Sequence, residues 1–77
     1  MNATIYTTPT CGYCKQAKIY LNNLGVSVKE IDISRDPRAA EEINRKTGQT
    51  SVPVIIIKGS TVVGFDKNRI NLLLGVN

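Results

Sequence analysis

The chain has 77 residues, of which 42% are hydrophobic and 21% are charged. This length allows one compact core and leaves no room for a second domain of ordinary size, so residues 1–77 are predicted to form a single domain. The formal net charge is +4. The basic residues nevertheless form no block and lack interleaved aromatic side chains, so nucleic acid is not an expected partner. We expect a monomer.

The N-terminal residues carry no sign of export. They lack a positive stretch followed by a long apolar block, and no apolar run in the chain reaches the roughly 18 residues of a membrane span. No membrane contact is therefore predicted, and the cytoplasm is the expected location. Two cysteines are also too few for the disulfide scaffold of a small secreted protein.

The first predicted elements are a strand and a helix. Residues Ala3–Thr7 favour β-structure and run into Pro9, which indicates a strand that ends at a loop. The helix that follows is predicted to have Thr10 as its N-cap and Gly25 at its left-handed end. Its apolar residues recur at three- and four-residue steps: Cys14, Ala17, Leu21 and Leu24.

A second strand and a second helix are predicted next. Residues Val26–Ile33 are rich in β-formers and give the strand. Asp36 followed by Pro37 is typical of an N-cap and a first helical position, so a helix is expected from there to about Lys46. Gly48 is expected to close it.

The last part of the chain predicts a hairpin and a third helix. Val52–Ile57 is a nearly continuous β-branched run, which is typical of a strand covered on both faces. The short turn 58–60 leads into a strand over 61–63. Asp66 is expected to cap the final helix, which carries three apolar residues: Ile70, Leu72 and Leu73.

The predicted order is β-α-β-α-β-β-α, which places the chain in the α/β class. A parallel crossover followed by an antiparallel hairpin gives a four-stranded mixed sheet with helices on both faces. This is the arrangement of the thioredoxin-like fold.

The two cysteines form a C-x-x-C pair at the start of the first predicted helix. Three residues advance about 4.5 Å along a helix axis, which places the two Cα atoms roughly 5 Å apart, within reach of a disulfide. So short a loop removes little unfolded-chain entropy, and a disulfide there would add little stability. We therefore interpret Cys11 and Cys14 as a redox pair.

The position of each cysteine predicts its role. Free backbone N–H groups at a helix start favour the thiolate of Cys11 and are expected to lower its pKa below the free value of about 8.5. Cys11 is therefore the candidate nucleophile. Cys14 begins the apolar stripe, so it should be less accessible and is the candidate resolving thiol. In this scheme Cys11 attacks a substrate disulfide and Cys14 then releases the reduced substrate.

Other uses of a C-x-x-C pair fit less well. The chain has no His and no third Cys, so it offers neither a Cys-His nucleophile pair nor the ligands of a closed zinc site. No metal ligand is assigned. Two structural cysteines that happen to be spaced this way remain an alternative, as does an iron-sulfur cluster shared between two chains.

Three segments resemble glutaredoxins and glutaredoxin-like redoxins: Tyr6–Lys15, Gly48–Pro53 and Val63–Asp66. Their order and spacing match that family over essentially the whole chain. The resemblance implies that Pro53 is in the cis form and that the backbone at Val52 pairs with an extended thiol substrate. It also implies a glutathione or substrate site that consists of Tyr13, Gln49, Ser51, Val52, Pro53, Gly64, Phe65 and Asp66.

The chain departs from many glutathione-using members of that family at particular positions. Val63 and Lys67 replace the first Gly and the second Asp of a G-G-x-D-D turn, and Thr8 stands where a Lys meets glutathione. Gly12 replaces the usual Pro between the cysteines. Thr10 stands where thioredoxins have Trp, which argues against a true thioredoxin.

The resemblance implies a dithiol glutaredoxin that reduces protein disulfides or glutathione mixed disulfides. Glutathione is then a co-substrate, and no cofactor is permanently bound. The Gly-Phe pair at 64–65 is also seen in redoxins that thioredoxin reductase reduces and that serve ribonucleotide reductase. A third hypothesis is an iron-sulfur cluster held between two chains by Cys11 and two glutathiones.

Overall fold

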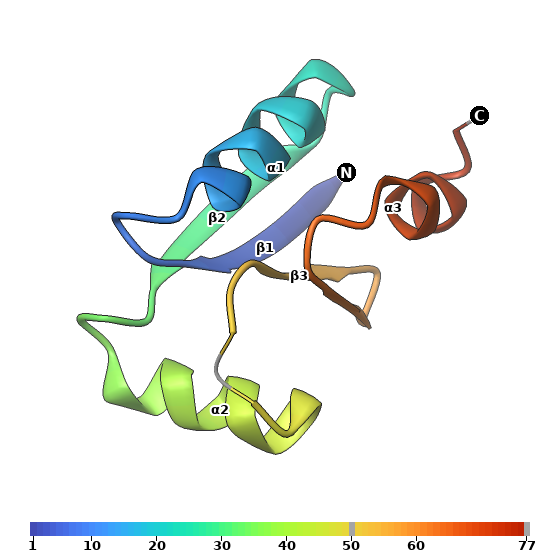
Figure 1. Cartoon of the computed structure of the whole chain (residues 1–77). Coiled ribbons are helices and arrows are strands. Elements are labelled where there is room, and N and C mark those ends of the chain that lie inside the picture. The colour runs from blue at the N-terminus through green and yellow to red at the C-terminus, as the bar shows by residue number, and fades with distance from the viewer. Residues whose placement is uncertain (50, 77) are drawn as a thin grey trace.

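The architecture comes from a computed structural model that describes residues 1–49 and 51–76. The elements follow one another in the predicted order (Figure 1). They are β1 (Asn2–Thr7), α1 (Gly12–Asn23), β2 (Ser27–Asp32), α2 (Pro37–Thr47), β3 (Val54–Ile57), β4 (Ser60–Val63) and α3 (Lys67–Leu74).

The strands form one four-stranded sheet in the order β2-β1-β3-β4. β1 runs parallel to β2, with Ile5 opposite Glu30. It runs antiparallel to β3, with Ile5 opposite Ile55, and β3 runs antiparallel to β4. The predicted thioredoxin-like fold, a mixed sheet with helices on both faces, is therefore confirmed.

Side chains of the central strands alternate between two buried clusters, because successive residues of a strand point to opposite faces. Ile5, Ile55 and Ile57 face α1 and α3 in the larger cluster. Tyr6 and Val54 face α2 in the smaller one. In Figure 1, α1 and α3 accordingly lie on one side of the sheet and α2 on the other.

Helix α1 buries the stripe that its sequence predicted, with two corrections at its ends. Cys14, Ala17 and Leu21 are buried. Leu24 is exposed, and it is already the C-cap of the helix, beyond the buried turn that ends at Leu21. The predicted N-cap Thr10 is wrong, since the last extended residue before the helix is Cys11.

The caps of the other two helices are as predicted. The carboxylate of Asp36 accepts the N–H of Ala39 at the start of α2. Gly48 ends that helix with φ 79°, a left-handed conformation that glycine adopts without strain. The carboxylate of Asp66 accepts the N–H of Arg69 in the same way at the start of α3.

Some predicted boundaries are corrected by the structure. The third strand starts at Val54 rather than at residue 52, because the chain around Pro53 is a loop. The second strand covers Ser27–Asp32 within the predicted 26–33. In α3, Leu72 is 80% exposed and Leu74 is buried, since Leu74 lies one turn from the buried Ile70.

Over the described residues, none of the helices combines the length and the apolar character that crossing a membrane requires.

Ile55 tests the larger cluster. Its side chain is fully buried in a central strand. We expect Ile55→Ala to lower the free energy of unfolding by about 2–5 kcal/mol, because a buried cavity remains. Ile19→Ala, on the exposed side of α1, is the matched control and should change stability by less than about 0.5 kcal/mol. Urea unfolding measures both, and equal losses would contradict the assignment.

Tyr6 tests the smaller cluster by pH. Burial raises the pKa of its phenol above 10.0, and the carboxylates of Glu42 and Asp36 raise it further. An unfolded chain therefore loses this proton at a lower pH than the folded one. The stability that Tyr6 contributes is complete below about pH 10 and is lost as the pH rises through the raised value.

We expect the free energy of unfolding to fall more steeply between about pH 9 and pH 11 in the natural chain than in Tyr6→Phe. All other side chains are the same in the two proteins, so their contributions cancel in the comparison. Parallel pH profiles for the two proteins would show that the phenol of Tyr6 is not shielded.

Candidate active site

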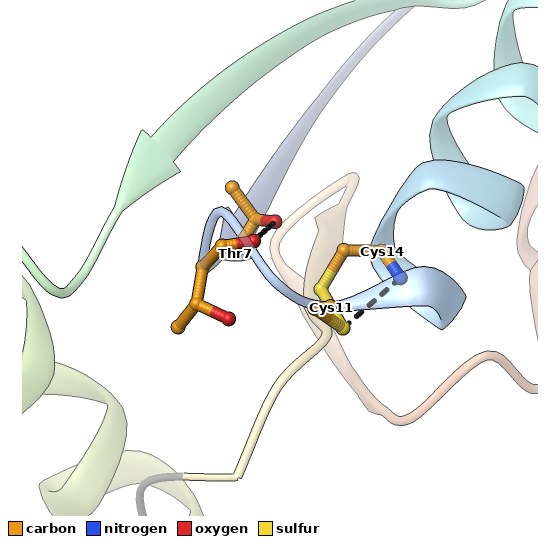
Figure 2. The surroundings of a disulfide bond; sticks show 4 residues. Thr7, Cys11 and Cys14 are labelled. Carbon is orange, nitrogen blue, oxygen red and sulfur yellow. Dashed lines mark hydrogen bonds between the residues drawn. A yellow bond between two sulfur atoms is a disulfide. The ribbon is translucent and has the colours of Figure 1, made fainter.

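The cysteine pair lies where the loop after β1 enters α1. Cys11 is the N-cap of the helix and Cys14 is in its first turn. Their Cα atoms are 5.3 Å apart and their sulfurs are joined in a disulfide (Figure 2). The separation of roughly 5 Å predicted from helix geometry is therefore confirmed.

The two sulfurs differ sharply in their surroundings. Cys14 is only 2% exposed and belongs to the larger buried cluster. Cys11 is half-buried at the edge of the same cluster. Cys11 is therefore more accessible than Cys14, which is the order of access that the sequence predicted.

Backbone groups hold Cys11 at the start of the helix. The N–H of Cys14 donates to Cys11 Sγ at 3.1 Å, as the dashed line in Figure 2 shows. The N–H of Cys11 donates to the carbonyl of Thr8 at 3.2 Å, and the hydroxyl of Thr7 donates to the same oxygen. A donor aimed at Cys11 Sγ favours the thiolate once the disulfide is reduced.

The loop around Pro53 and the turn at Gly64 meet beside the pair. The Val52–Pro53 bond is cis, as the resemblance implied. The N–H of Gly64 donates to the carbonyl of Pro53 at 2.8 Å, and Gly64 has φ 82°, which favours glycine. Val52 packs against the same buried cluster as Cys11.

The other predicted site residues are less tightly placed. Tyr13 is 66% exposed. Gln49 is exposed in the loop after α2, and its backbone is hydrogen-bonded to the hydroxyl of Thr47 rather than to the cysteine loop. Ser51 is exposed too, and Thr50 lies outside the described residues. The structure therefore places Val52, Pro53 and the Gly64 turn beside the redox pair. It shows no hydrogen bond between Gln49 and the described residues of the cysteine loop.

Phe65 and Asp66 continue the Gly64 turn into α3. Phe65 is half-buried and packs edge-on against Tyr20, with ring centroids 5.7 Å apart. Asp66 is exposed and uses one carboxylate oxygen as the cap of α3. Lys67 places its ammonium over both rings, 5.3 Å from the centroid of Tyr20 and 5.5 Å from that of Phe65.

Sequence reasoning missed Tyr20 and Asn71. The hydroxyl of Tyr20 donates to the side-chain oxygen of Asn71, so it links α1 to α3 behind the Gly64 turn. Tyr20 is one residue away from the apolar stripe, and Asn71 is a polar residue in an apolar helix. These positions are unusual, but neither of them indicates that the two side chains form a hydrogen bond with each other across 51 residues of the chain.

Among the described residues, no group of three or more His, Cys, Asp or Glu side chains lies close enough together to hold a metal ion. The iron-sulfur hypothesis needs a second chain and stays a prediction.

Comparison with known proteins bears on the same region. A family model described as Glutaredoxin matches residues 3–62, which include both cysteines and the Pro53 loop. The chain belongs to the glutaredoxin family. A glutaredoxin-like protein of 8.6 kDa from the rubredoxin operon of Clostridium pasteurianum, itself uncharacterized, is 39% identical over 91% of this chain and 93% of that one.

Two other relatives are better defined by name. Glutaredoxin 3 of Escherichia coli K12 is 40% identical over 84% of this chain and 78% of its own length. The solved structure of the NrdH-redoxin from Escherichia coli, described as a glutaredoxin-like protein with a thioredoxin-like activity profile, has a TM-score of 0.82 and 36% identity over 95% of each chain.

Family membership and the geometry of the pair lead to one activity. Glutaredoxins exchange thiols and disulfides, and Cys11 and Cys14 form the C-x-x-C motif that this chemistry uses. The protein is a thiol-disulfide oxidoreductase.

Differential alkylation tests the access to the two thiols. After reduction, iodoacetamide should modify Cys11 first and leave Cys14 mostly unmodified, because Cys11 is more exposed and receives an N–H. Peptide mass spectrometry of quenched samples gives the two rates. In urea the two rates should converge, and faster labelling of Cys14 in the folded protein would reverse the assignment.

Proposed function

We propose that the protein is a dithiol glutaredoxin that reduces protein disulfides and glutathione mixed disulfides. The observation that carries this proposal is the asymmetry of the pair. Cys11 is half-buried at the edge of the core and accepts an N–H at a helix start, while Cys14 is fully inside the core three residues later. This arrangement suits one attacking thiol and one resolving thiol.

The proposed reaction has two exchange steps. The Cys11 thiolate attacks one sulfur of the substrate disulfide and forms a mixed disulfide with it. The substrate S–S bond breaks, and the other substrate sulfur leaves as a thiolate and takes up a proton. Cys14, as a thiolate, then attacks Cys11 Sγ, the bond between Cys11 and the substrate breaks, and the substrate sulfur that Cys11 had attacked leaves as a thiolate and takes up a proton. The substrate gains two electrons and the enzyme is left with the Cys11–Cys14 disulfide. Two molecules of glutathione restore the dithiol and become oxidised glutathione.

The loops beside the pair are proposed to hold the thiol ligand. The main chain of Val52 would pair with an extended substrate next to Cys11. Asp66 uses Oδ1 to cap α3, which leaves Oδ2 to accept from the ammonium group of glutathione. The exposed ring of Tyr13 would cover the ligand beside the helix start.

A second candidate is a redoxin that thioredoxin reductase reduces and that serves ribonucleotide reductase. The observation in its favour is the side chain of Lys67, which lies over Phe65 and Tyr20 beside the turn and brings a positive charge where many glutathione-using members have an acid. The likeness to the NrdH-redoxin of Escherichia coli, which extends over nearly the whole of both chains, supports it as well.

We further propose that residues 1–77 act as one domain and as a monomer in the cytoplasm, where the thiol pool keeps such pairs reduced.

Paired turnover assays test the electron source. A small disulfide is supplied with NADPH, once with glutathione and glutathione reductase and once with thioredoxin reductase. We expect rapid turnover with glutathione. Turnover only with thioredoxin reductase would establish the second candidate, and absence of turnover with either would contradict both.

Cysteine variants test the proposed roles in the same assay. Cys11→Ser should reduce turnover to background, because it removes the attacking sulfur. Cys14→Ser should keep part of the activity on glutathione mixed disulfides, which needs only one thiol, and lose the reduction of protein disulfides. Full activity in Cys11→Ser would show that the roles are misassigned.

A further inference from the structure

A groove runs from the Gly64 turn along the side of α1, and we call it the Lys67 groove. Its larger hollow, of about 610 Å³, is lined by Gln16, Val63, Phe65, Asp66, Lys67 and Asn68. A smaller hollow of about 270 Å³ shares Gln16, Phe65 and Lys67 with it and continues over Ile19 and Tyr20. The groove is therefore continuous between α1 and α3.

The groove begins close to the redox pair. Gln16 in its wall is five residues after Cys11 on the same helix, about 7.5 Å along the axis and about 140° around it. An extended peptide covers that path with about three to four residues. A segment that flanks a cysteine bonded to Cys11 can therefore reach the groove.

Two apolar residues, Val63 and Phe65, line the larger hollow among polar ones. Val63 is 47% exposed at the end of the edge strand β4. Phe65 is half-buried, and its ring is fixed by the edge-on contact with Tyr20. Tyr20 is fixed in turn by its hydrogen bond to Asn71. A peptide side chain would meet a preformed surface here.

The uncompensated charge in the groove belongs to Lys67. Its ammonium lies over the two rings, and no carboxylate of the described residues forms an ion pair with it. Asp66 also lines the groove, but its carboxylate is hydrogen-bonded to the N–H of Arg69 at the positive end of α3. A carboxylate from a partner would fill the place that none of the described carboxylates takes.

We propose that the Lys67 groove binds an acidic segment of a protein substrate, next to the cysteine that Cys11 attacks. The carboxylate of that segment pairs with Lys67, and an apolar side chain packs on Val63 and Phe65. This inference rests on the proposed reduction of protein disulfides. It adds that the preferred protein substrates have acidic residues beside the cysteine that Cys11 attacks. A nucleic acid fits less well, because the groove carries one cation rather than a row of them and also includes Asp66.

The test uses three peptides of equal length, each with one cysteine as a neutral thiopyridine mixed disulfide. The residues beside the cysteine are Glu in one peptide, Gln in the second and Lys in the third. Pre-reduced protein is mixed with each peptide at low salt without glutathione, and released thiopyridone gives the second-order rate constant. We expect the Glu peptide to react roughly two- to fivefold faster than the Gln peptide, as for an exposed ion pair.

The variants assign the preference to one side chain. Lys67→Gln should remove it, Lys67→Glu should reverse it in favour of the Lys peptide, and salt should weaken it in the natural chain. Lys29→Glu changes the net charge by the same amount on the exposed strand β2, at the opposite edge of the sheet. That control should keep the preference. Equal rates for the three peptides, or an unchanged preference in Lys67→Glu, would overturn the proposal.

A binding measurement separates this proposal from the proposed function. A Glu peptide with Ser in place of Cys cannot react, and NMR titration should show shifts at Phe65 and Lys67 that are lost in Lys67→Glu. Such binding without any reduction of disulfides would sink the proposed function and keep the groove. If Lys67→Glu slows only the recovery of the dithiol by glutathione, with peptide rates unchanged, then glutathione is the occupant and the proposal for the groove is wrong.

Discussion

The burial of Cys14 is the constraint on which the active site depends. Its side chain belongs at once to the hydrophobic core and to the disulfide, so the first turn of α1 is anchored to the sheet through one half of the redox pair. Because Cys14 cannot move outwards without exposing the core, Cys11 is held at the surface three residues earlier. The difference in access between the two sulfurs follows from packing rather than from any special group beside them.

Hydrogen bonds of the main chain then assemble the rest of the site around that anchor. The N–H of Cys14 points at Cys11 Sγ, and the N–H of Gly64 joins its turn to the carbonyl of Pro53. These contacts use no charged side chain, which suits a chain without histidine. The reactivity of Cys11 accordingly depends on how the helix begins, and substitutions on the surface should affect partner choice more than thiol chemistry.

We propose that partner choice depends on the surface on the other side of the Gly64 turn. Phe65, Tyr20 and Lys67 form a fixed aromatic surface with a cation above it. A family that shares one reaction can diverge at such a surface, because the charge beside the thiol selects the partner without changing the exchange steps.

Local patterns were sufficient for much of the fold. The caps at Asp36 and Asp66 and the left-handed end at Gly48 follow from side chains that satisfy the backbone within a few residues. The C-x-x-C spacing at a helix start likewise predicted the Cα separation and the ranking of access. Where local signals competed, the prediction failed, as at Thr10, a good capping residue by type that lies one position before the residue that caps the helix.

The sequence by itself therefore determined the order of elements, the redox pair and the family, because each depends on near neighbours or on a spaced motif. Only the tertiary structure decided which residues from distant parts of the chain contact one another. The link from Tyr20 to Asn71 joins residues 51 positions apart. The placement of Lys67 over the ring of Tyr20 depends on how α3 packs against α1. Such contacts depend on the relative positions of whole elements, which no local pattern specifies.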